Sequence, residues 1–463
     1  MYFYLKYYVK YDIIIVIKIP FIMETDMKKH LIVASIDAMV FEDLEFCKTL
    51  PNFAKIMNGA SIIERVKTIY PSVTHPVHAT LITGNPAGVT GAVNNSIFNP
   101  DTPDKGNGIW YNAMNQMKCE TIFHAAKRAG LTTATSSWPM TSCGQDVIDY
   151  LVPCALGTDF IGFENNPIDA YRNLGAQECV IPIIEEAVKR FTHENKHPAV
   201  DEFQAYCCVE IIKRFKPNLL FTHPSYVDNQ RHAGGIFGEK VNHALRETDR
   251  WLGMMLDAVK EAGIEEETDF VFLSDHGQIN ITRTISPNVY LADKGYIELD
   301  DGGSVKSWLA YSKSTGASAH VYLKEPDNEK LYDEVYKLLA DMAKEGIYGF
   351  ERVYTVEEVK EKYNLYGDFS FVLETDGYTS FGEWCVRPSV RGFDLSDYRF
   401  GKGTHGHEPH KGPQPTFVAS GPSFASGVCI PYGDILDHAP TIAAAFGLEM
   451  PSAKGKVVKE ILK

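Results

Sequence analysis

The sequence predicts an α/β fold in which helices cover both faces of a mostly parallel central sheet, with a small α+β subdomain inserted into it. Three observations support this prediction. Short apolar or β-branched runs recur along the chain, and helical patterns separate them. Residues 288–400 show a different sequence pattern from the rest. With 463 residues, the chain is long enough for one large α/β domain that carries an insertion.

Five short runs are expected to form buried strands. They are HLIVASI (30–36), TTATSSW (132–138), NLLFTHP (218–224), DFVFLS (269–274) and TFVASG (416–421). Helical patterns lie between them, most clearly over 241–263, where Val241, Leu245 and Leu252 share an apolar stripe that Gly263 ends. Continuous apolar strands that alternate with helices indicate a parallel sheet buried on both faces.

Residues 288–400 are expected to form the inserted cap subdomain. Its patterns indicate a strand, a helix and a strand, at SAHVYLKE (318–325), EKLYDEVYKLLADMAKEG (329–346) and DFSFVLETDGY (368–378). The α/β core would then consist of residues 28–287 and 401–463. We expect Tyr378, Phe381 and Trp384 to serve core packing, with a place in a pocket wall as the alternative.

Residues 1–27 are expected to lie outside the core. They are aromatic and aliphatic, but three lysines interrupt the apolar run well short of the ~20 residues that span a bilayer. No small-residue cleavage site of a secretory signal follows. A translation start at Met23 or Met27, or a poorly ordered extension, is therefore favoured over a membrane anchor.

The net charge limits the kinds of partner that we expect, and the cysteine pattern indicates the redox compartment. Lys and Arg number 45 and Asp and Glu number 60, so the net charge is −15, and no basic run is present. This balance argues against binding to a nucleic-acid polymer, which needs clustered Lys and Arg. The nine cysteines include no CxxC pair, so we expect reduced thiols and a cytoplasmic location. The oligomeric state is not indicated.

Carboxylates and histidines follow the predicted strands. Asp37 follows the first run, Asp228 and His232 follow the third, and Asp275 and His276 follow the fourth. Ligands of parallel α/β sheets bind beyond the carboxyl ends of the strands, so we expect these side chains to converge. A single Asp after a strand is usually a helix cap, but the whole set indicates a metal site.

A histidine-rich loop, GTHGHEPH, lies just before the last predicted strand and contains His405, His407 and His410. Mixed oxygen and nitrogen donors suit zinc or a similar first-row divalent ion. Together with the residues at the strand ends, the donors are numerous enough for two ions.

The stretch YPSVTHPVHATLITG (70–84) contains five hydroxyl side chains. Taken alone, it indicates a polar turn before a helix, because Ser and Thr cap helices and make turns more often than they act as nucleophiles. Thr74 is placed at the N-cap of that helix, with Pro76 in the first turn.

Six motifs occur in the order found in the type I phosphodiesterase/nucleotide pyrophosphatase family of the alkaline phosphatase superfamily. They are IDAM (36–39), THPVHATLITG (74–84), GAVNNSIFNP (91–100), DNQRH (228–232), SDHG (274–277) and GTHGHEP (403–409). The chain resembles this family from about residue 28 to its C-terminus, including DILDHAPTIAAAFGL (434–448). The resemblance implies an alkaline-phosphatase-like core and a hydrolase of phosphodiester or phosphoanhydride bonds.

The resemblance also implies two divalent metal ions, with Zn²⁺ the favoured identity, and a threonine nucleophile. By motif position, one ion would be held by Asp37, Thr74, Asp275 and His276, and the other by Asp228, His232 and His405. His405 is preferred to His407 because it precedes the glycine of the motif. His407 and His410 are expected to be loop residues or to support the ligands from behind.

Thr74 takes the position of the nucleophile, and the N-terminal amides of its helix would then face a phosphoryl oxygen. Coordination to a divalent cation would stabilise its alkoxide, and the implied reaction is two in-line displacements through a phosphoryl-threonine. Asn95 takes the position of the residue that donates a hydrogen bond to the phosphoryl oxygen. Asn94 as the donor, and a turn at Asn94-Asn95, are the alternatives.

Two departures from the family pattern leave the substrate open. His75 stands where nucleotide-cleaving members place an aromatic residue that stacks on the base, and FTHPSYVD lacks the Glu-x-Pro-Asp lead-in of the animal enzymes. We expect a small phosphate-ester or nucleotide-like substrate, such as a dinucleotide, a nucleotide sugar or a lipid-derived diester. The alternative is a phosphonate hydrolase of the phosphonoacetate hydrolase type. A metal-binding protein without catalysis is disfavoured, because every catalytic position is filled.

Overall fold

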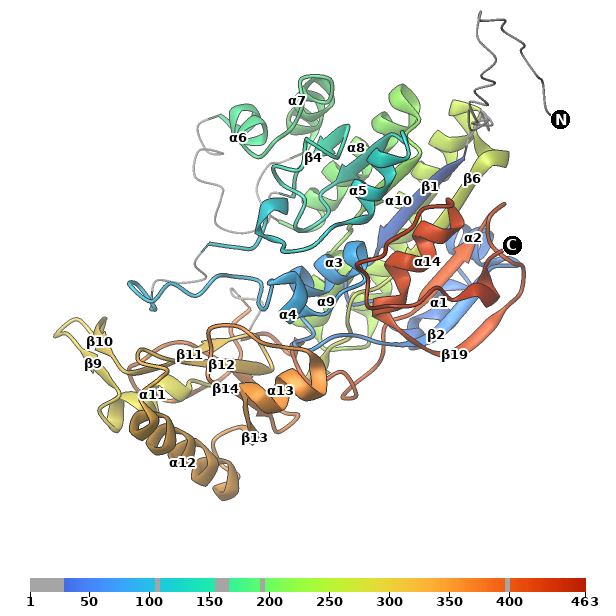
Figure 1. The fold of residues 1–463 in the computed structure, drawn as a ribbon. Helices are drawn as coiled ribbons and strands as arrows, with labels where there is room; N and C mark the ends of the chain where they lie inside the picture. The colour runs from blue at the N-terminus through green and yellow to red at the C-terminus, as the bar shows by residue number, and fades with distance from the viewer. Residues whose placement is uncertain (1–28, 105–108, 155–165, 192–195, 396–399) are drawn as a thin grey trace, which may run out of the picture.

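The computed structural model describes residues 29–104, 109–154, 166–191, 196–395 and 400–463. The expected N-terminal extension, residues 1–27, lies outside these ranges. Figure 1 shows a larger lobe built around a central sheet and a smaller lobe beside it, formed by the yellow to orange part of the chain.

Within the described residues, the central sheet has eight strands in the order β19-β2-β18-β6-β1-β5-β3-β4. They are β1 (His30–Ser35), β2 (Ser61–Lys67), β3 (Thr133–Ser136), β4 (Tyr150–Val152), β5 (Leu219–Thr222), β6 (Thr268–Leu273), β18 (Phe417–Ser420) and β19 (Cys429–Asp434). Only β18 runs antiparallel to its neighbours, β2 and β6, and the other neighbouring pairs of this sheet are parallel. The predicted mostly parallel sheet is confirmed, and the five predicted runs are β1, β3, β5, β6 and β18.

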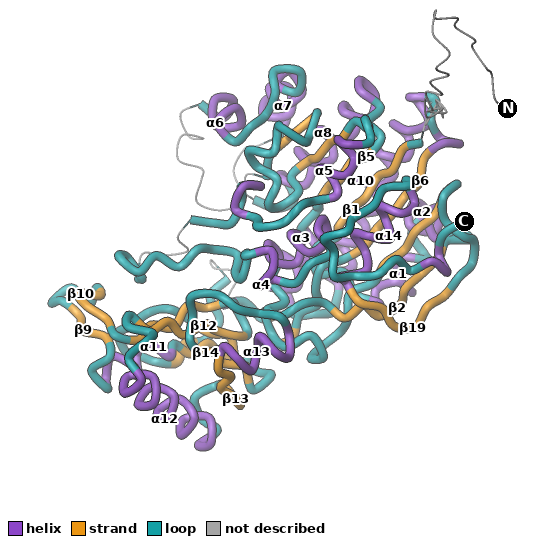
Figure 2. Tube along the Cα trace, in the orientation of Figure 1, coloured by secondary structure: helices purple, strands orange, loops and turns teal. Residues whose placement is uncertain are grey.

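Helices pack on both faces of this sheet (Figure 2). Alternate residues of β1 show why: Leu31 and Val33 join one apolar cluster, whereas Ile32 and Ala34 join the other. The first cluster includes α3 (Thr74–Thr83), α5 (Ile122–Arg128) and α14 (His438–Ala445). The second includes α1 (Leu44–Cys47), α2 (Pro51–Met57), α6 (Pro167–Asn173), α7 (Ile181–Arg190), α8 (Ala199–Phe215) and α10 (Glu239–Ala262).

Helix α10 corresponds to the pattern predicted over 241–263. Its apolar stripe is buried against the sheet, and Gly263 ends it with a positive φ of 70° in the left-handed region. In the part of the chain that the structure describes, no helix combines the length and the apolar character needed to cross a membrane.

The smaller lobe contains a four-stranded antiparallel sheet in the order β11-β12-β14-β13. Its elements are α11 (Pro287–Asp293), β11 (Ala310–Ser314), β12 (Ser318–Leu323), α12 (Glu329–Glu345), β13 (Phe350–Thr355), α13 (Val356–Tyr363) and β14 (Phe371–Thr375). The predicted strand, helix and strand are β12, α12 and β14. The lobe lies between β6 and β18 in the chain, and the limits 288 and 400 stay a prediction.

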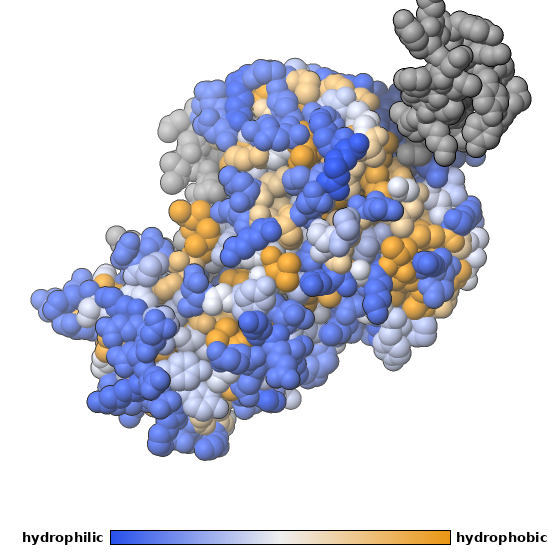
Figure 3. All heavy atoms as spheres, in the orientation of Figure 1, coloured by the Kyte–Doolittle hydropathy of each residue, from blue (hydrophilic) through white to orange (hydrophobic). Residues whose placement is uncertain are grey.

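Short strands complete the region between β6 and β18. They are β7 (Ile279–Asn280), β8 (Arg283–Ile285), β9 (Ile297–Leu299), β10 (Val305–Trp308), β15 (Thr379–Phe381), β16 (Val390–Arg391) and β17 (Gly403–Thr404). Strand β8 pairs with β15 and β16, and β7 pairs with β17. Hydrophilic side chains cover most of the smaller lobe in the view of Figure 3.

Candidate active site

Three neighbouring parallel strands, β6, β1 and β5, end at one edge of the central sheet, and the predicted metal-binding residues follow them. Asp37 lies two residues after β1, and Asp275 and His276 follow β6. Asp228 lies in the first turn of α9 (Tyr226–Gly234), which begins four residues after β5. The edge of the sheet therefore brings these side chains together, as expected for a parallel α/β fold.

One group contains Asp37, Asp275 and His276, whose donor atoms lie within 4.8 Å of one another. His276 Nε2 is 3.2 Å from Asp275 Oδ2 and 3.5 Å from Asp37 Oδ1. Thr74 Oγ1 is 3.2 Å from the same His276 nitrogen. All four residues predicted for one metal ion therefore meet around His276 Nε2.

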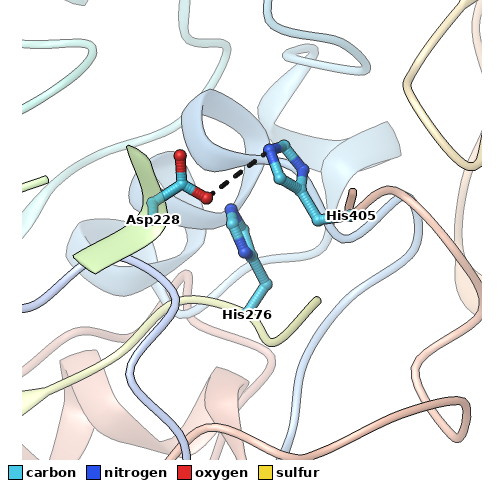
Figure 4. Close-up of side chains that lie close together, drawn as sticks. All are labelled: Asp228, His276 and His405. Carbon is cyan, nitrogen blue, oxygen red and sulfur yellow. Dashed lines mark ion pairs between the residues drawn. The ribbon is translucent and has the colours of Figure 1, made fainter. Parts of the chain in front are cut away.

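A second group of donor atoms within 4.8 Å of one another contains Asp228, His276 and His405 (Figure 4). Asp228 Oδ1 is 3.9 Å from His405 Nε2, and Asp228 Oδ2 is 3.2 Å from His232 Nε2. The predicted set of Asp228, His232 and His405 is thus brought together. His276 belongs to both groups. Its ring stacks on the ring of His405, with 4.1 Å between the ring centroids.

The other ring nitrogens of His232 and His405 are held by backbone carbonyls. His232 Nδ1 lies 2.7 Å from the Gly403 oxygen, and His405 Nδ1 lies 3.1 Å from the Ser72 oxygen. Such contacts set the tautomer and the ring orientation, and they leave Nε2 as the metal-facing nitrogen. His232 and His405 therefore carry the outer hydrogen bonds that metal-binding histidines need, whereas His276 Nδ1 has no hydrogen-bond partner among the described residues.

Two buried carboxylate oxygens indicate that these residues suit a cation. Asp37 Oδ1 and Asp275 Oδ2 are buried and have no hydrogen-bond partner among the described residues. Burial, followed by the charges of Asp275 and Asp228, raises the pKa of Asp37 well above its usual value. Burial raises the pKa of Asp275 to about 6. Carboxylates this close and this poorly hydrated need positive charge, which divalent cations would supply.

His276 and His405 are held neutral, as metal ligands must be. Burial lowers the pKa of His276 to about 3 and lowers that of His405 well below its usual value. Neutral imidazoles beside carboxylates suit a first-row divalent ion.

The start of α3 differs from the prediction. Val73 is the N-cap and Thr74 is the first helical residue, so the expected N-cap position of Thr74 is wrong by one residue. Thr74 makes no capping hydrogen bond, and its hydroxyl faces His276 instead. The backbone N–H of His75 donates to Asn95 Oδ1 at 2.9 Å, and Pro76 has no N–H. Of the first three residues of α3, Thr74 alone therefore has an amide for a phosphoryl oxygen.

The two neighbouring asparagines have different surroundings. Asn94 is engaged at both ends, because its Nδ2 donates to the Ser314 carbonyl at 3.0 Å and its Oδ1 accepts from the Asn95 N–H at 2.7 Å. Asn95 uses Oδ1 to accept from His75, so its Nδ2 is the group that a ligand can contact. Both residues line the pocket described below.

His407 and His410 belong to neither group of donor atoms. His407 is buried and its Nδ1 lies 3.0 Å from the Glu408 carbonyl oxygen, whereas the His410 side chain is 67% exposed. Their placement agrees with the expected loop role.

Sequence reasoning missed three residues that contact the site. His223 Nε2 is 3.2 Å from Asp37 Oδ2, and Gln278 Nε2 donates to Asp228 Oδ1. Arg231 is buried and its Nε donates to the Ala38 carbonyl at 3.0 Å. His223 follows β5 as Asp37 follows β1, so its position after a strand was a usable signal. Nothing local marks Gln278 or Arg231.

A pocket opens beside these residues toward the smaller lobe. It is lined by Val73, Asn94, Asn95, Ser96, Ser314, Thr315, Gly316, Glu383, Thr404 and His405. Two glycines allow the turn between β11 and β12 to approach the His405 loop. A Cβ on Gly316 would lie 2.4 Å from the His405 carbonyl oxygen, and one on Gly406 would lie 1.9 Å from that of Thr315.

Tyr378, Phe381 and Trp384, for which a place in a pocket wall was the alternative to core packing, are not part of this lining. Phe381 is fully buried in the core of the smaller lobe, in line with the packing role, whereas Tyr378 is 63% exposed. Glu383, which lies between Phe381 and Trp384 in sequence, lines the pocket instead. His75 is also fully buried and packs edge-on against Trp110 with ring centroids 4.9 Å apart, so it offers no face to a ligand.

Comparison with known proteins identifies related sequences. The sequence profile described as type I phosphodiesterase/nucleotide pyrophosphatase matches residues 31–407. Ectonucleotide pyrophosphatase/phosphodiesterase family member 1 of Mus musculus is 23% identical over 268 residues, which are 56% of this chain and 25% of the mouse protein. A pyrophosphatase/phosphodiesterase of Schizosaccharomyces pombe is 23% identical over 283 residues, or 55% of this chain and 50% of the yeast protein. The matched regions thus span a quarter to a half of these relatives.

Solved structures share the fold. Murine ectonucleotide pyrophosphatase/phosphodiesterase 5 superposes with a TM-score of 0.63 and 19% identity, covering 94% of this chain and all of the murine chain. An inactive variant of the murine protein in complex with AMP gives the same values, and the human counterpart is 20% identical. The alkaline-phosphatase-like fold is therefore confirmed.

Proposed function

Since the chain belongs to the type I phosphodiesterase/nucleotide pyrophosphatase family, we propose that it is a metal-dependent hydrolase of phosphodiester or phosphoanhydride bonds with Thr74 as its nucleophile. One observation carries this proposal. The Thr74 hydroxyl, at the first turn of α3, lies 3.2 Å from Nε2 of His276, the residue that both groups of carboxylates and imidazoles share. A hydroxyl that caps nothing and points into such a cluster is placed for nucleophilic attack.

The donor set fits two divalent ions, with zinc favoured by its mixture of nitrogen and oxygen atoms. One ion would be held by Asp37, Thr74, Asp275 and His276, and the other by Asp228, His232 and His405. When bound, the ions supply Lewis-acid stabilisation of charge on the attacking and leaving oxygens.

The residues of this chain would act as follows. Thr74 Oγ1 attacks phosphorus, forms an O–P bond and displaces the leaving oxygen on the opposite side. The Asn95 Nδ2 group and the Thr74 N–H donate hydrogen bonds to the non-bridging oxygen, on which negative charge is held. Water then attacks the phosphoryl-threonine, breaks the Thr74 O–P bond and returns the hydroxyl.

A phosphonate hydrolase was the alternative from the sequence. The family profile and the named relatives are described as phosphodiesterases and pyrophosphatases, which cleave P–O bonds. These descriptions favour cleavage of P–O bonds over cleavage of P–C bonds. Nucleotide-type substrates agree with the names of the relatives and with the AMP complex of the murine protein. A cytoplasmic location stays a prediction from the cysteine pattern.

The test compares turnover of bis-p-nitrophenyl phosphate and p-nitrophenyl phosphate by zinc-loaded wild type, Thr74→Ala and Thr83→Ala. Thr83 is a matched control, because it is buried in the same helix and its hydroxyl bonds the Ala79 carbonyl at 2.7 Å. We expect diester turnover well above monoester turnover, lost in Thr74→Ala and kept in Thr83→Ala. Monoester preference, or equal activity of Thr74→Ala and wild type, would contradict the proposal.

A further inference from the structure

We infer that the smaller lobe is part of the metal site, because it sets the position of the predicted metal ligand His405 through Glu408. Glu408 is a positioning residue in this inference, and it acts on the metal only through His405. The inference rests on the proposed function, which places one divalent ion at Asp228, His232 and His405.

The loop that carries His405 is bonded to both lobes. On the side of the larger lobe, the Gly406 N–H donates to the Ser72 carbonyl at 2.9 Å, and Ser72 Oγ donates to the His407 carbonyl at 2.9 Å. On the side of the smaller lobe, the Ala317 N–H donates to the His405 carbonyl at 2.7 Å. The backbone around His405 is therefore held between the two lobes.

The side chain of Glu408, three residues after His405, adds a further link to the smaller lobe. It is 5% exposed, and its Oε1 accepts hydrogen bonds from the hydroxyls of Tyr354 and Tyr363. The same oxygen pairs with Lys362 Nζ at 2.8 Å. Tyr354 lies on β13 and the other two donors lie on α13, so all three belong to the smaller lobe. Hydrogen bonds to a carboxylate are roughly twice as strong as neutral ones, so Glu408 is an effective anchor for the loop.

The backbone of Glu408 is bonded to the same lobe. Its N–H donates to Glu374 Oε1 at 3.1 Å, and Glu374 Oε2 accepts from the Tyr70 hydroxyl at 2.8 Å. Glu374 lies on β14 and is fully buried, and Tyr70 precedes Thr74 by four residues. One buried carboxyl of the smaller lobe thus joins the loop that carries His405 to the loop that leads to Thr74.

A shift of the loop would move a metal ligand. His405 Nε2 is 3.9 Å from Asp228 Oδ1, its partner in the proposed site. Distances between a metal and its ligands vary by only about 0.2 Å, so loss of the Glu408 anchor should weaken the ion at His405. The other proposed ion, at Asp37 and Asp275, has no ligand on this loop and should bind as in the wild type.

The experiment follows stepwise Zn²⁺ binding to metal-free protein by competition with a chromogenic chelator. Wild type should bind two equivalents. Glu408→Ala should weaken one of them by about 10- to 100-fold, the range for residues that support a metal ligand by hydrogen bonds, and should leave the other unchanged. Glu408→Gln keeps an acceptor oxygen for the same donors and should restore most of the affinity.

His405→Ala identifies the affected ion. It should weaken the same equivalent, and adding Glu408→Ala to it should cause no further loss of Zn²⁺ affinity, because the two residues then act as one unit. Unchanged binding in Glu408→Ala, weakening of both equivalents, or a further loss in the double variant would overturn the inference. Glu408 would then have a merely structural role.

A second variant tests the inference without truncating Glu408. Tyr354→Phe combined with Tyr363→Phe deletes only two hydroxyls of the smaller lobe, and it should weaken the same equivalent at least about tenfold. Tyr290→Phe is the matched control, because it deletes a hydroxyl of the same lobe that donates to Ser389 Oγ at 2.9 Å. The control should leave both equivalents unchanged, and equal effects of the control and the double variant would overturn the inference.

Zinc binding is measured without turnover, which separates this inference from the proposed function. Selective loss of one equivalent, with cleavage of neither p-nitrophenyl ester by wild type, would refute the hydrolase and keep the inference. Turnover of the diester by wild type, with equal loss of both equivalents in Glu408→Ala, would keep the hydrolase and overturn the inference.

Discussion

Arg231 connects the two groups of metal-ligating side chains, and its removal is expected to be costly. It lies on α9 between Asp228 and His232, yet its side chain reaches back to the loop after β1. There Nε donates to the Ala38 carbonyl at 3.0 Å and NH2 pairs with Asp43, while NH1 donates to the Ile236 carbonyl.

The expected magnitude follows from burial. Arg231 is 1% exposed and Asp43 is 4% exposed, so Arg231→Ala leaves a buried carboxylate whose remaining contact is the Val40 N–H at 2.8 Å. Removing one partner of such a pair costs about 3–5 kcal/mol. Arg231 also bonds the carbonyl of Ala38, which has a positive φ of 57° beside Asp37. Loss of this support should additionally weaken metal binding.

Equilibrium urea unfolding in the presence of a chelator, followed by tryptophan fluorescence, measures the first effect. Arg246→Ala is the matched control, because Arg246 pairs with Glu239 at 2.7 Å on the solvent side of α10, where both side chains are exposed. The control should leave the free energy of unfolding close to that of the wild type, because an exposed ion pair contributes little. Equal small effects for both variants would refute the argument that burial sets the value of the Arg231 contacts.

Three further predictions concern the site and its support. Gln278→Ala removes the hydrogen bond to Asp228 and should weaken metal binding by about 10- to 100-fold, measured by competition with a chromogenic chelator; unchanged affinity would rule out a positioning role. Asn95→Ala should lower kcat about 100-fold, the cost of losing one donor to the phosphoryl oxygen, and Asn94→Ala should lower it much less; the reverse order would assign the donor role to Asn94. Burial raises the pKa of Glu374 from 4.5 to about 7, so the folded protein keeps a proton that the unfolded chain releases. Wild type should therefore lose about 3 kcal/mol of stability relative to Glu374→Gln as the pH rises from 4.5 to 7, and a pH-independent difference in urea unfolding would contradict this.

Local sequence pattern determined much of the fold. The five predicted strands were found because buried parallel strands are continuous apolar runs, and α10 was found because its stripe has the helical period. Strands β2, β4 and β19 escaped prediction, and β4 is an edge strand of only three residues. The burial of β2 follows no simple alternation, and β19 is a mostly exposed edge strand that contains Pro431.

The sequence by itself also determined that the polar residues at the strand ends meet, because the residues that follow neighbouring parallel strands lie at one edge of the sheet. Only the tertiary structure decided which groups support and surround them. Ala38 N–H reaches Asp275 across 237 positions and Arg231 reaches Asp43 across 188, while Glu383 meets Ser314 across 69. Such contacts depend on how whole elements pack, and no local spacing encodes them.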